Sequence, residues 1–273
     1  MEHYRFEEIA DRVVAAIATP HGGGRGNAAI VRIDGGTVVF DTGMTPRAGE
    51  ELRREAEQLG PVAWVVNSHW HGDHVRGNQA FRDVEIVSTS RTRELIATRA
   101  AEALARHRGF DFGPLLASVR AGADRGLREL VSSLDDLELR LPTRTFEDRL
   151  ELVPGCDLIT LGGGHTESDG FLVLAERRVA LTGDLLAVDM HPWIGDGDPH
   201  RWVEILRELE TLDVDRFVPG HGRVATLEDV RAFREHLESF LAEPDTIESR
   251  YPGWEFWDDT ADRNRAFLRD RAV

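Results

Sequence analysis

The chain has 273 residues, of which 41% are hydrophobic and 30% charged. That length can bury a sizeable core, and it fits one large α/β domain or two small ones. Acidic residues outnumber basic ones by 49 to 33, giving a formal net charge of −16 at pH 7, which disfavours nucleic acid and anionic membranes as partners. The sequence contains no lysine, which excludes a Walker-type phosphate loop and any lysine-nucleophile or Schiff-base chemistry.

Cysteine usage and the first residues indicate where the protein resides. The single cysteine, Cys156, excludes a disulfide within the chain and fits a reducing cytoplasm. The first eight residues lack the basic start and apolar run of a signal peptide. No apolar run approaches the roughly 18 residues of a membrane span. We therefore expect a cytoplasmic protein with a small-molecule substrate and no nucleic-acid or membrane partner, with homodimerisation left open.

The first third of the sequence is typical of short strands joined by tight turns. Asp34-Gly35-Gly36 is a strong hairpin signal between two apolar runs. Pro46 stands where a helix should begin and Gly60 just after its end. The expected elements are strands at 12–18, 28–33, 37–40 and 62–66, with a helix at 46–59.

Residues 90–140 differ in character, because they are rich in Ala, Arg, Leu and Glu. Apolar residues recur there at helical spacing, which predicts two or three helices broken near residues 109–114. This segment is either an inserted helical cap or a set of ordinary packing helices, and the pattern alone does not separate the two.

Strands return from Arg144 onward. No Pro/Ser-rich linker, repeat or low-complexity tract interrupts the chain, so we expect a single domain over residues 1–273. The remaining expected elements are strands at 157–161, 171–174, 179–182 and 216–218, with helices at 199–212 and 226–241.

Three histidines and an aspartate fall within six residues, directly after an expected strand. The run is Ser68-His69-Trp70-His71-Gly72-Asp73-His74. Imidazole nitrogen and carboxylate oxygen are preferred ligands of Zn²⁺ and also of Fe and Mn. Neither a helix nor a regular strand would point these four side chains together, so we expect a loop that directs two histidines one way and the Asp-His pair another. Two clusters suggest two metal ions.

Further candidate ligands follow other expected strands. His165 comes after three glycines, Asp184 follows the run at 179–183, and His221 follows Phe217-Val-Pro-Gly. In each case a short strand is expected to end and a glycine lets the backbone turn sharply beside a metal ion.

In combination these residues resemble the metallo-β-lactamase superfamily over nearly the whole chain. The match comprises Asp41-Thr-Gly, the His-x-His-x-Asp-His run, His165, Asp184 and His221, in that order. The resemblance implies an α/β fold, an αββα sandwich of two mixed sheets flanked by helices, with the metal ions at one edge between the sheets. It implies that one ion is held by His69, His71 and His165 and the other by Asp73, His74 and His221. Asp184 would bridge both ions, and Asp41 would orient a ligating histidine from outside.

The resemblance also implies the chemistry. Two divalent ions, Zn²⁺ first and Fe or Mn as alternatives, would share a hydroxide that attacks the carbonyl of an ester, thioester, lactone or amide. Asp73 would orient the hydroxide and pass a proton to the leaving group. Members named for β-lactam hydrolysis usually have Cys or another residue where this chain has Asp184, so the chain is more similar to glyoxalase-II-like thioesterases, lactonases and general hydrolases. The alternative is an oxidoreductase with one iron, similar to persulfide dioxygenases.

Several other residues have a structural and a functional interpretation. His191 lies in the loop after Asp184 and is a candidate substrate contact. Trp70, between two ligands, either lines the pocket or packs beneath the loop. The glycine-rich loop at 21–27 resembles a phosphate-cradling loop, but no helix follows it, so we expect a mobile loop bordering the cleft. We expect His3, His107 and His236 at the surface, and the aromatic run at 251–257 packed on the core or on the helical segment.

Overall fold

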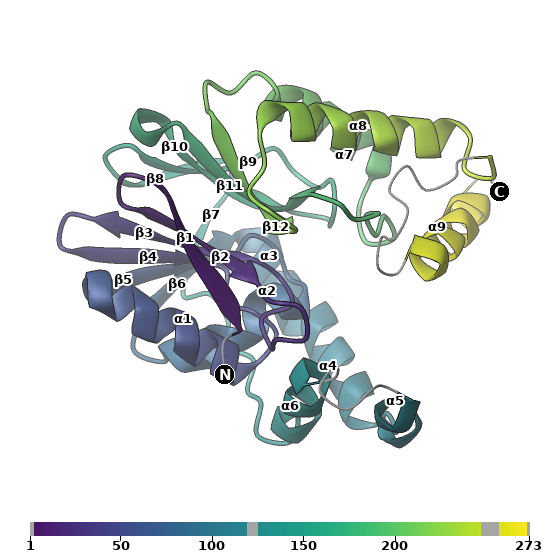
Figure 1. Ribbon diagram of the computed structural model, residues 1–273, viewed down its shortest axis with the longest axis horizontal. Helices are drawn as coiled ribbons and strands as arrows, with labels where there is room; N and C mark the ends of the chain where they lie inside the picture. The colour runs from purple at the N-terminus through teal and green to yellow at the C-terminus, as the bar shows by residue number, and fades with distance from the viewer. Residues whose placement is uncertain (1–2, 119–124, 247–256, 272–273) are drawn as a thin grey trace.

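The computed structural model describes residues 3–118, 125–246 and 257–271. Two β-sheets pack face to face, and helices cover the outer face of each (Figure 1). This confirms the expected αββα sandwich. No helix among the described residues is long and apolar enough to span a bilayer.

The first sheet has seven strands, and its order follows the chain. Strands β1 to β4 form an antiparallel meander, whereas β4 to β7 run parallel. A parallel pair needs a crossover connection, and α1 (Pro46–Leu59) supplies the one between β4 and β5. The strands are β1 (Tyr4–Ala10), β2 (Val13–Ala18), β3 (Ala28–Ile33), β4 (Gly36–Phe40), β5 (Val62–Val66), β6 (Glu85–Thr89) and β7 (Arg144–Phe146).

The second sheet has five strands in the order β12-β11-β10-β9-β8. Its outer face is covered by α7 (Pro199–Leu209) and α8 (Leu227–Ala242), while α9 (Trp257–Arg271) lies beyond the end of α8 (Figure 1). The strands are β8 (Arg149–Val153), β9 (Cys156–Thr160), β10 (Gly170–Leu174), β11 (Val179–Ala187) and β12 (Arg216–His221).

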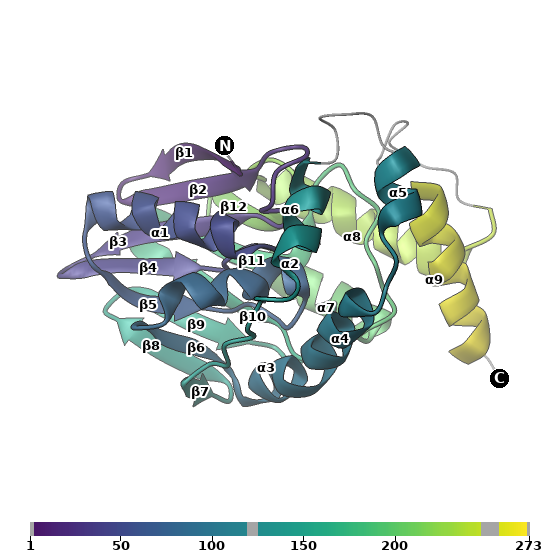
Figure 2. The ribbon, with the colours of Figure 1, turned by 90° about the horizontal axis from the view of Figure 1, so that it is seen from below.

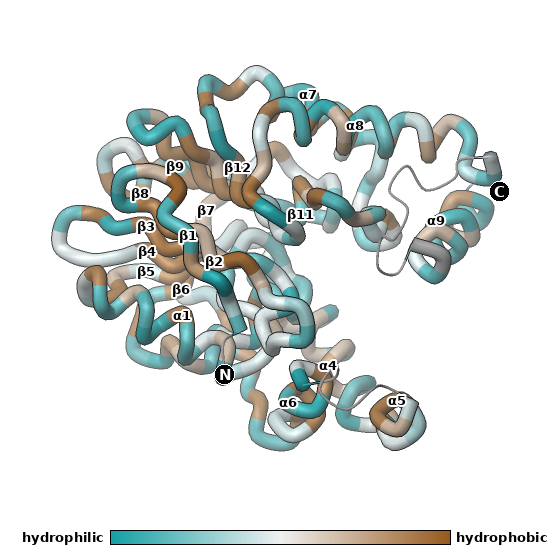
Figure 3. The backbone as a smooth tube through the Cα atoms, in the orientation of Figure 1, coloured by the Kyte–Doolittle hydropathy of each residue, from teal (hydrophilic) through white to brown (hydrophobic). Residues whose placement is uncertain are grey.

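Alternate residues of a central strand enter two different hydrophobic layers. In β3, Ala29 and Val31 pack in the core between the sheets, whereas Ala28 and Ile30 pack in the layer that contains Leu52 of α1. A strand covered on both faces is apolar along its length, which explains the run of small and branched residues from Ala28 to Val31. The brown segments in Figure 3 follow this core through both sheets.

Residues 90–118 and 125–133 contain a group of helices beside the first sheet (Figure 2). The first part is unbroken from Ser90 to Arg108, and Gly109 ends it. The described part is more segmented than the two or three helices expected. Its elements are α3 (Ser90–Leu95), a π-helical turn (Ile96–Ala100), α4 (Ala101–Arg108), α5 (Gly113–Ser118) and α6 (Arg125–Ser133).

Helices α4 and α6 share a small hydrophobic cluster of their own. Leu104 packs there with Leu130, Leu134 and Leu137. The segment is also joined to the turn of helix that follows His74, because the buried Arg76 donates a hydrogen bond of 2.8 Å to His107 Nδ1. His107 is therefore half-buried and not a free surface residue.

Two expectations about the segments that carry the candidate ligands need correction. The motif run was expected in a loop, but Asp73 and His74 lie in a short helix, α2 (Gly72–Val75), followed by a 3₁₀ helix (Arg76–Phe81). The strand expected to end at Thr182 continues to Ala187, because a bulge at Gly183, with φ 52°, lets pairing with β12 resume. Asp184 thus lies within β11.

His3 and His236 are buried, contrary to the surface positions expected for them. His3 Nδ1 accepts a hydrogen bond from the Gly23 amide at 2.9 Å. His236 lies on the inner face of α8, with Nε2 2.8 Å from His191 Nδ1. Both partners come from distant segments, which local sequence patterns do not reveal. The aromatic run expected to pack at 251–257 lies outside the described residues, apart from the backbone of Trp257.

Candidate metal centre

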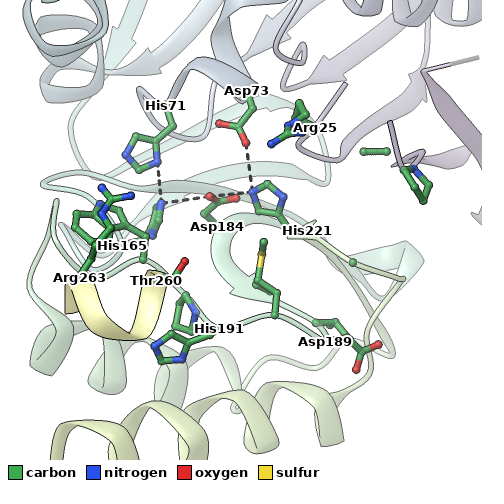
Figure 4. A pocket seen from close by; sticks show the side chains of 18 of the residues that line it. Arg25, His71, Asp73, His165, Asp184, Asp189, His191, His221, Thr260 and Arg263 are labelled. Carbon is green, nitrogen blue, oxygen red and sulfur yellow. Dashed lines mark hydrogen bonds and ion pairs between the residues drawn. The ribbon is translucent and has the colours of Figure 1, made fainter. Parts of the chain in front are cut away.

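Five segments bring the seven predicted ligands to one edge between the sheets. His69 and His71 follow β5, Asp73 and His74 occupy α2, and His165 lies in the loop after β9. Asp184 is in β11 and His221 ends β12. The ends of β5 and β12 and an inner residue of β11 therefore converge on one site, where Figure 4 labels His71, Asp73, His165, Asp184 and His221.

The first group of side chains comprises His69, His71, His165 and Asp184, each offering a ligand atom within 4.8 Å of the others. His165 Nε2 lies 2.9 Å from His71 Nδ1 and 3.2 Å from Asp184 Oδ2. His69 Nε2 lies 3.6 Å from the same carboxylate oxygen. This is the combination that the family resemblance implied for one ion.

The second group comprises Asp73, His74 and His221. Asp73 Oδ2 lies 3.5 Å from His221 Nε2 and 3.8 Å from His74 Nε2. Asp184 faces this group as well, because its Oδ1 is 3.1 Å from His74 Nε2 and its Oδ2 is 3.4 Å from His221 Nε2. Its position between the groups suits the bridging role expected for it.

These donors fit divalent cations. His69 Nε2, His74 Nε2 and Asp184 Oδ1 are buried and have no hydrogen-bond partner within the described chain, and buried polar atoms rarely stay unsatisfied. Ligand atoms bound tetrahedrally to zinc lie roughly 3.3 Å from one another, given bonds of about 2.0–2.1 Å. The separations within each group are close to that value, and the nitrogen and carboxylate donors suit Zn²⁺, Fe or Mn.

The electrostatics keep the Asp184 carboxylate ionised. Burial raises the pKa of Asp184, but His221, His74 and His69 around it outweigh burial and hold that pKa well below its usual range. Burial lowers the pKa of His74, but Asp184 and Asp73 outweigh it and raise that pKa. Asp184 is therefore anionic at neutral pH, the form in which a carboxylate binds a metal ion.

Asp41 supports two of the histidines from behind. Its Oδ2 lies 2.9 Å from His74 Nδ1 and accepts a hydrogen bond from Ser68 Oγ at 2.7 Å. Ser68 Oγ in turn lies 2.9 Å from His69 Nδ1. Both histidines are thus held through Nδ1, which turns Nε2 towards the site. The structure shows the outer contact expected for Asp41 and adds Ser68, which the sequence did not single out.

Asp196 is a supporting residue that sequence reasoning missed. Its Oδ2 lies 3.1 Å from His71 Nε2 and accepts a hydrogen bond from Trp193 Nε1 at 2.6 Å. Burial raises the pKa of Asp196, but the bond to His71 and its charge bring the net shift below the ordinary value. The neighbouring Asp198 caps α7 instead, and no local pattern distinguishes the two aspartates.

Asn27 is a second missed residue, and it fastens the glycine-rich loop to β12. Its Nδ2 donates to the carbonyls of Pro219, at 3.0 Å, and Gly222, at 2.8 Å. Its Oδ1 accepts from the Ala18 amide at 2.9 Å. Asn27 therefore holds both sides of His221 against the end of the first sheet.

A cavity of about 670 Å³ opens over the two groups. The loop at 21–27 borders it through His21 and Arg25, as expected, and His191 lines it. Trp70 lies outside this cavity: it packs with Leu95 and Ile96 beneath the ligand run and borders a separate hollow of about 210 Å³.

His191 is held firmly in the cavity wall. Its Nε2 accepts a hydrogen bond from Asn264 Nδ2 at 3.0 Å, and its Nδ1 faces His236. Asn264 Oδ1 accepts from the Ile194 amide at 3.2 Å, which orients the amide group. Burial first, and then His236, lower the pKa of His191 to about 3, so it is a neutral wall residue at physiological pH.

Comparison with known proteins adds two relatives. A linear primary-alkylsulfatase from Pseudomonas sp. (strain ATCC 19151) is 25% identical over 218 residues, covering 69% of this chain and 40% of the relative. A beta-lactamase-like protein 2 homolog from Caenorhabditis elegans is 25% identical over 182 residues, covering 64% and 48%. The chain therefore spans less than half the length of each of these relatives.

Solved structures share the fold. A metallo-beta-lactamase from Hirschia baltica superposes with a TM-score of 0.64 at 17% identity, covering 86% of this chain and 97% of that one. The metallo-beta-lactamase FIM-1 from Pseudomonas aeruginosa, in its mono-zinc form, has a TM-score of 0.64 at 15% identity, covering 86% and 95%. The family model for the metallo-beta-lactamase superfamily matches residues 21–221. Since that match includes all seven candidate ligands and the fold agrees, the chain belongs to the metallo-β-lactamase superfamily.

Proposed function

We propose that the protein is a dinuclear metal-dependent hydrolase that attacks the carbonyl carbon of an ester, thioester, lactone or amide and breaks the bond from that carbon to the oxygen, sulfur or nitrogen of the leaving group. One observation carries the proposal, namely the position of Asp184 between two complete groups of donors. Its Oδ1 lies 3.1 Å from His74 Nε2, and its Oδ2 lies 3.2 Å from His165 Nε2. A buried anion with an oxygen towards each group suits two neighbouring cations better than one.

The chemistry is divided between the cations and the chain. Divalent ions bound there would supply Lewis-acid activation of water and of the substrate oxygen. Asp73 lines the cavity, and burial raises its pKa less than His74 and His221 lower it. It is therefore ionised at neutral pH and can accept a proton and return it to the leaving group. Ser68, Asp41 and Asp196 act only by orienting histidines.

The cavity fits a small molecule. Its volume of about 670 Å³ lies in the range of small-molecule sites. Ala187, Val188 and Met190 give one wall an apolar character, which excludes water around an acyl or alkyl group. We infer a small-molecule substrate, no nucleic-acid or membrane partner, a single domain and a cytoplasmic location, and we leave homodimerisation to measurement.

A sulfate ester is the second candidate substrate. One relative is named as a linear primary-alkylsulfatase, and the match covers 69% of this chain. A sulfate ester can use the same two groups of donors, with the attack at sulfur replacing attack at carbonyl carbon. An iron-dependent oxidoreductase is the alternative from a different enzyme class, because nitrogen and carboxylate donors also suit iron.

Metal analysis and a substrate panel test the proposal together. The protein is purified without added metal, analysed for Zn, Fe and Mn, and assayed on esters, thioesters, lactones, amides and alkyl sulfates. The double variant His69→Ala/His71→Ala is compared with His200→Ala, which removes an exposed histidine on α7. We expect two metal equivalents and hydrolysis in the wild type and in His200→Ala. In the double variant we expect the loss of metal binding and of hydrolysis.

The possible outcomes separate the candidates. Unchanged turnover in the double variant would refute the metal-dependent mechanism. Cleavage of alkyl sulfates alone would favour the second candidate. One iron equivalent, with oxygen consumption and no hydrolysis, would replace the proposal with the oxidoreductase.

A further inference from the structure

Two arginines line the cavity without belonging to the metal centre. Arg25 comes from the glycine-rich loop and Arg263 from α9, and Figure 4 shows them on opposite flanks of the ligand cluster. Neither guanidinium lies within 4.0 Å of a carboxylate oxygen among the residues that the structure describes. In a chain with 49 acidic and 33 basic residues, two such cations facing one cavity need an explanation.

Arg25 is held next to the second group of ligands. A Cβ atom built on the adjacent Gly26 would lie 2.7 Å from the His74 ring, so the loop passes directly over that ligand. The carbonyl of Gly24 accepts hydrogen bonds from the amides of Gly26, at 2.8 Å, and Met44, at 2.9 Å. These bonds tie the turn around Arg25 to the rest of the first layer.

The backbone of Arg25 is also unusual. Its φ of 64° lies in the left-handed region, which non-glycine residues adopt at a cost and which is found most often at functional sites. His21 and Asp189, with φ of 67° and 58°, line the same cavity. Half of the six non-glycine residues with positive φ in the described chain thus border this one cavity.

Arg263 is preorganised by an aromatic ring. Its guanidinium carbon lies 4.4 Å from the centroid of the Trp193 ring, a favourable cation–π geometry. The Trp193 Nε1–H is fixed by Asp196, and a Cβ atom on Gly195 would lie only 2.1 Å from the ring. The indole therefore rests closely on Gly195, and its face is presented to Arg263.

Helix α9 is itself fastened to the cavity loop. Asn264 Nδ2 donates to the Pro192 carbonyl at 2.7 Å and to His191 Nε2 at 3.0 Å. Thr260 and Arg263, one turn of α9 apart, both line the cavity. The family match ends at residue 221, so this wall is a feature of this chain beyond the matched region.

The charges around the cavity favour an anionic ligand. Asp73 and Asp184 belong to the metal groups, and two divalent cations would more than balance them. The remaining acidic residue, Asp189, has Arg223 Nε 3.9 Å from its Oδ2. The two arginines are therefore in excess, beside an apolar wall that includes Val188 and Met190.

We propose that Arg25 and Arg263 are specificity-determining residues that bind an anionic group on the substrate, a carboxylate, sulfate or phosphate carried by an apolar body. The planar guanidinium group suits such anions, because it donates two parallel hydrogen bonds. The inference rests on the proposed hydrolase function and names the class of substrate for that same site.

Paired substrates test this directly. The metal-loaded protein is assayed with mono-p-nitrophenyl glutarate and with p-nitrophenyl butyrate, two esters that differ chiefly in a terminal carboxylate. The variants are Arg25→Gln, Arg263→Gln and the double variant, and the matched control is Arg54→Gln, an exposed arginine on α1 outside the cavity. Calorimetric titration of glutarate, sulfate and phosphate gives a readout that does not depend on turnover.

We expect the wild type and Arg54→Gln to prefer the anionic ester. Each single variant should lose about tenfold in kcat/KM for that ester, as for the loss of a charge-assisted hydrogen bond, while the neutral ester changes less than about twofold. Arg25→Lys and Arg263→Lys should restore part of the preference. The anion that binds most tightly in calorimetry identifies the group.

Two possible results distinguish failure of the arginine assignment from failure of the hydrolase proposal. If the neutral and anionic esters are hydrolysed equally and the variants change neither rate nor anion binding, the arginine assignment is wrong while the hydrolase proposal stands. If none of the esters, thioesters, lactones, amides or alkyl sulfates is cleaved, but anions bind and the glutamine variants lose that binding, the hydrolase proposal fails while the anion site stands.

Discussion

Replacing Asp41 by asparagine changes one atom of the group that orients two ligands. Both carboxylate oxygens are engaged: Oδ1 accepts from the Ser68 amide at 2.8 Å, and Oδ2 faces Ser68 Oγ at 2.7 Å and His74 Nδ1 at 2.9 Å. An amide has one oxygen and one NH₂ group, so one side must present a donor. If the NH₂ group takes the place of Oδ1, it faces the backbone N–H of Ser68, which is also a donor and cannot reorient.

The other orientation disables a ligand. With NH₂ in place of Oδ2, His74 Nδ1 must become an acceptor, and the ring proton moves to Nε2. That atom lies 3.1 Å from Asp184 Oδ1 and is the one that must face the cation. Opposing a buried donor costs about 1–3 kcal/mol, and loss of such outer partners weakens metal binding by about 10–100-fold.

We therefore expect Asp41→Asn to bind at least one metal equivalent about 10–100-fold more weakly than the wild type. Competition with a chromophoric chelator measures the two affinities, and thermal unfolding of the metal-free protein shows whether the fold is retained. Asp34→Asn, at the exposed hairpin tip, makes the same chemical change away from the site. If Asp41→Asn bound both equivalents as tightly as Asp34→Asn, the orientation argument would be refuted.

Three further predictions concern Asp196, His191 and Cys156. Both donors to Asp196 converge on Oδ2, so Asp196→Asn can keep both hydrogen bonds. We expect Asp196→Leu to weaken metal binding by about 10–100-fold and Asp196→Asn to weaken it less. Chelator competition measures both affinities, and equal losses would show that only the charge of Asp196 matters. The pKa of His191 is about 3, whereas that of an unfolded histidine is about 6.5, so the unfolded state binds more protons between these values. Its stabilising contribution is complete above pH 6.5 and is lost as the pH falls towards 3, so between pH 7 and 5 this one residue should lower the unfolding free energy by about 2 kcal/mol. Urea unfolding of the metal-free protein at pH 7 and pH 5 measures this difference in unfolding free energy, which should be smaller in His191→Gln than in the wild type. The same pH dependence in both proteins would contradict the assignment to His191. Burial raises the pKa of the Cys156 thiol to about 12, so a thiol reagent at pH 8 should label it only after unfolding, at least about a hundredfold faster than in the native protein; rapid native labelling would show that the thiol is accessible.

Much of the fold could be predicted, because its signals are local. The helix at 46–59 was predicted with its observed ends, since Pro46 begins it and Gly60 follows it, and the structure adds Thr45 as its cap. The hairpin around Asp34-Gly35-Gly36 was predicted for the same reason. The extension of β11 to Ala187 was not, because it depends on pairing with β12 across a bulge at Gly183.

The candidate ligands could also be named from the sequence, because their order and spacing resemble a known family. Of the residues that support them, Asp41 could be named in the same way, but Asp196 and Asn27 could not. Asp196 is 125 residues from His71, and Asn27 is 192 residues from Pro219. The burial of His236 likewise depends on His191, 45 residues away. Such contacts arise only once the two sheets pack, so no local pattern marks them.

The hydrogen bonds of Asn27 to the residues on either side of His221 have a consequence for biosynthesis. Asn27 joins the glycine-rich loop before β3 to the carbonyls of Pro219 and Gly222, on either side of His221, which belongs to the second donor group. A nascent polypeptide emerges from the ribosome in order, so its early histidines are exposed long before residue 221 appears. The proposed second donor group is therefore complete only after His221 has been synthesised and the two sheets have packed, so metal loading of that group has to follow the folding of both sheets.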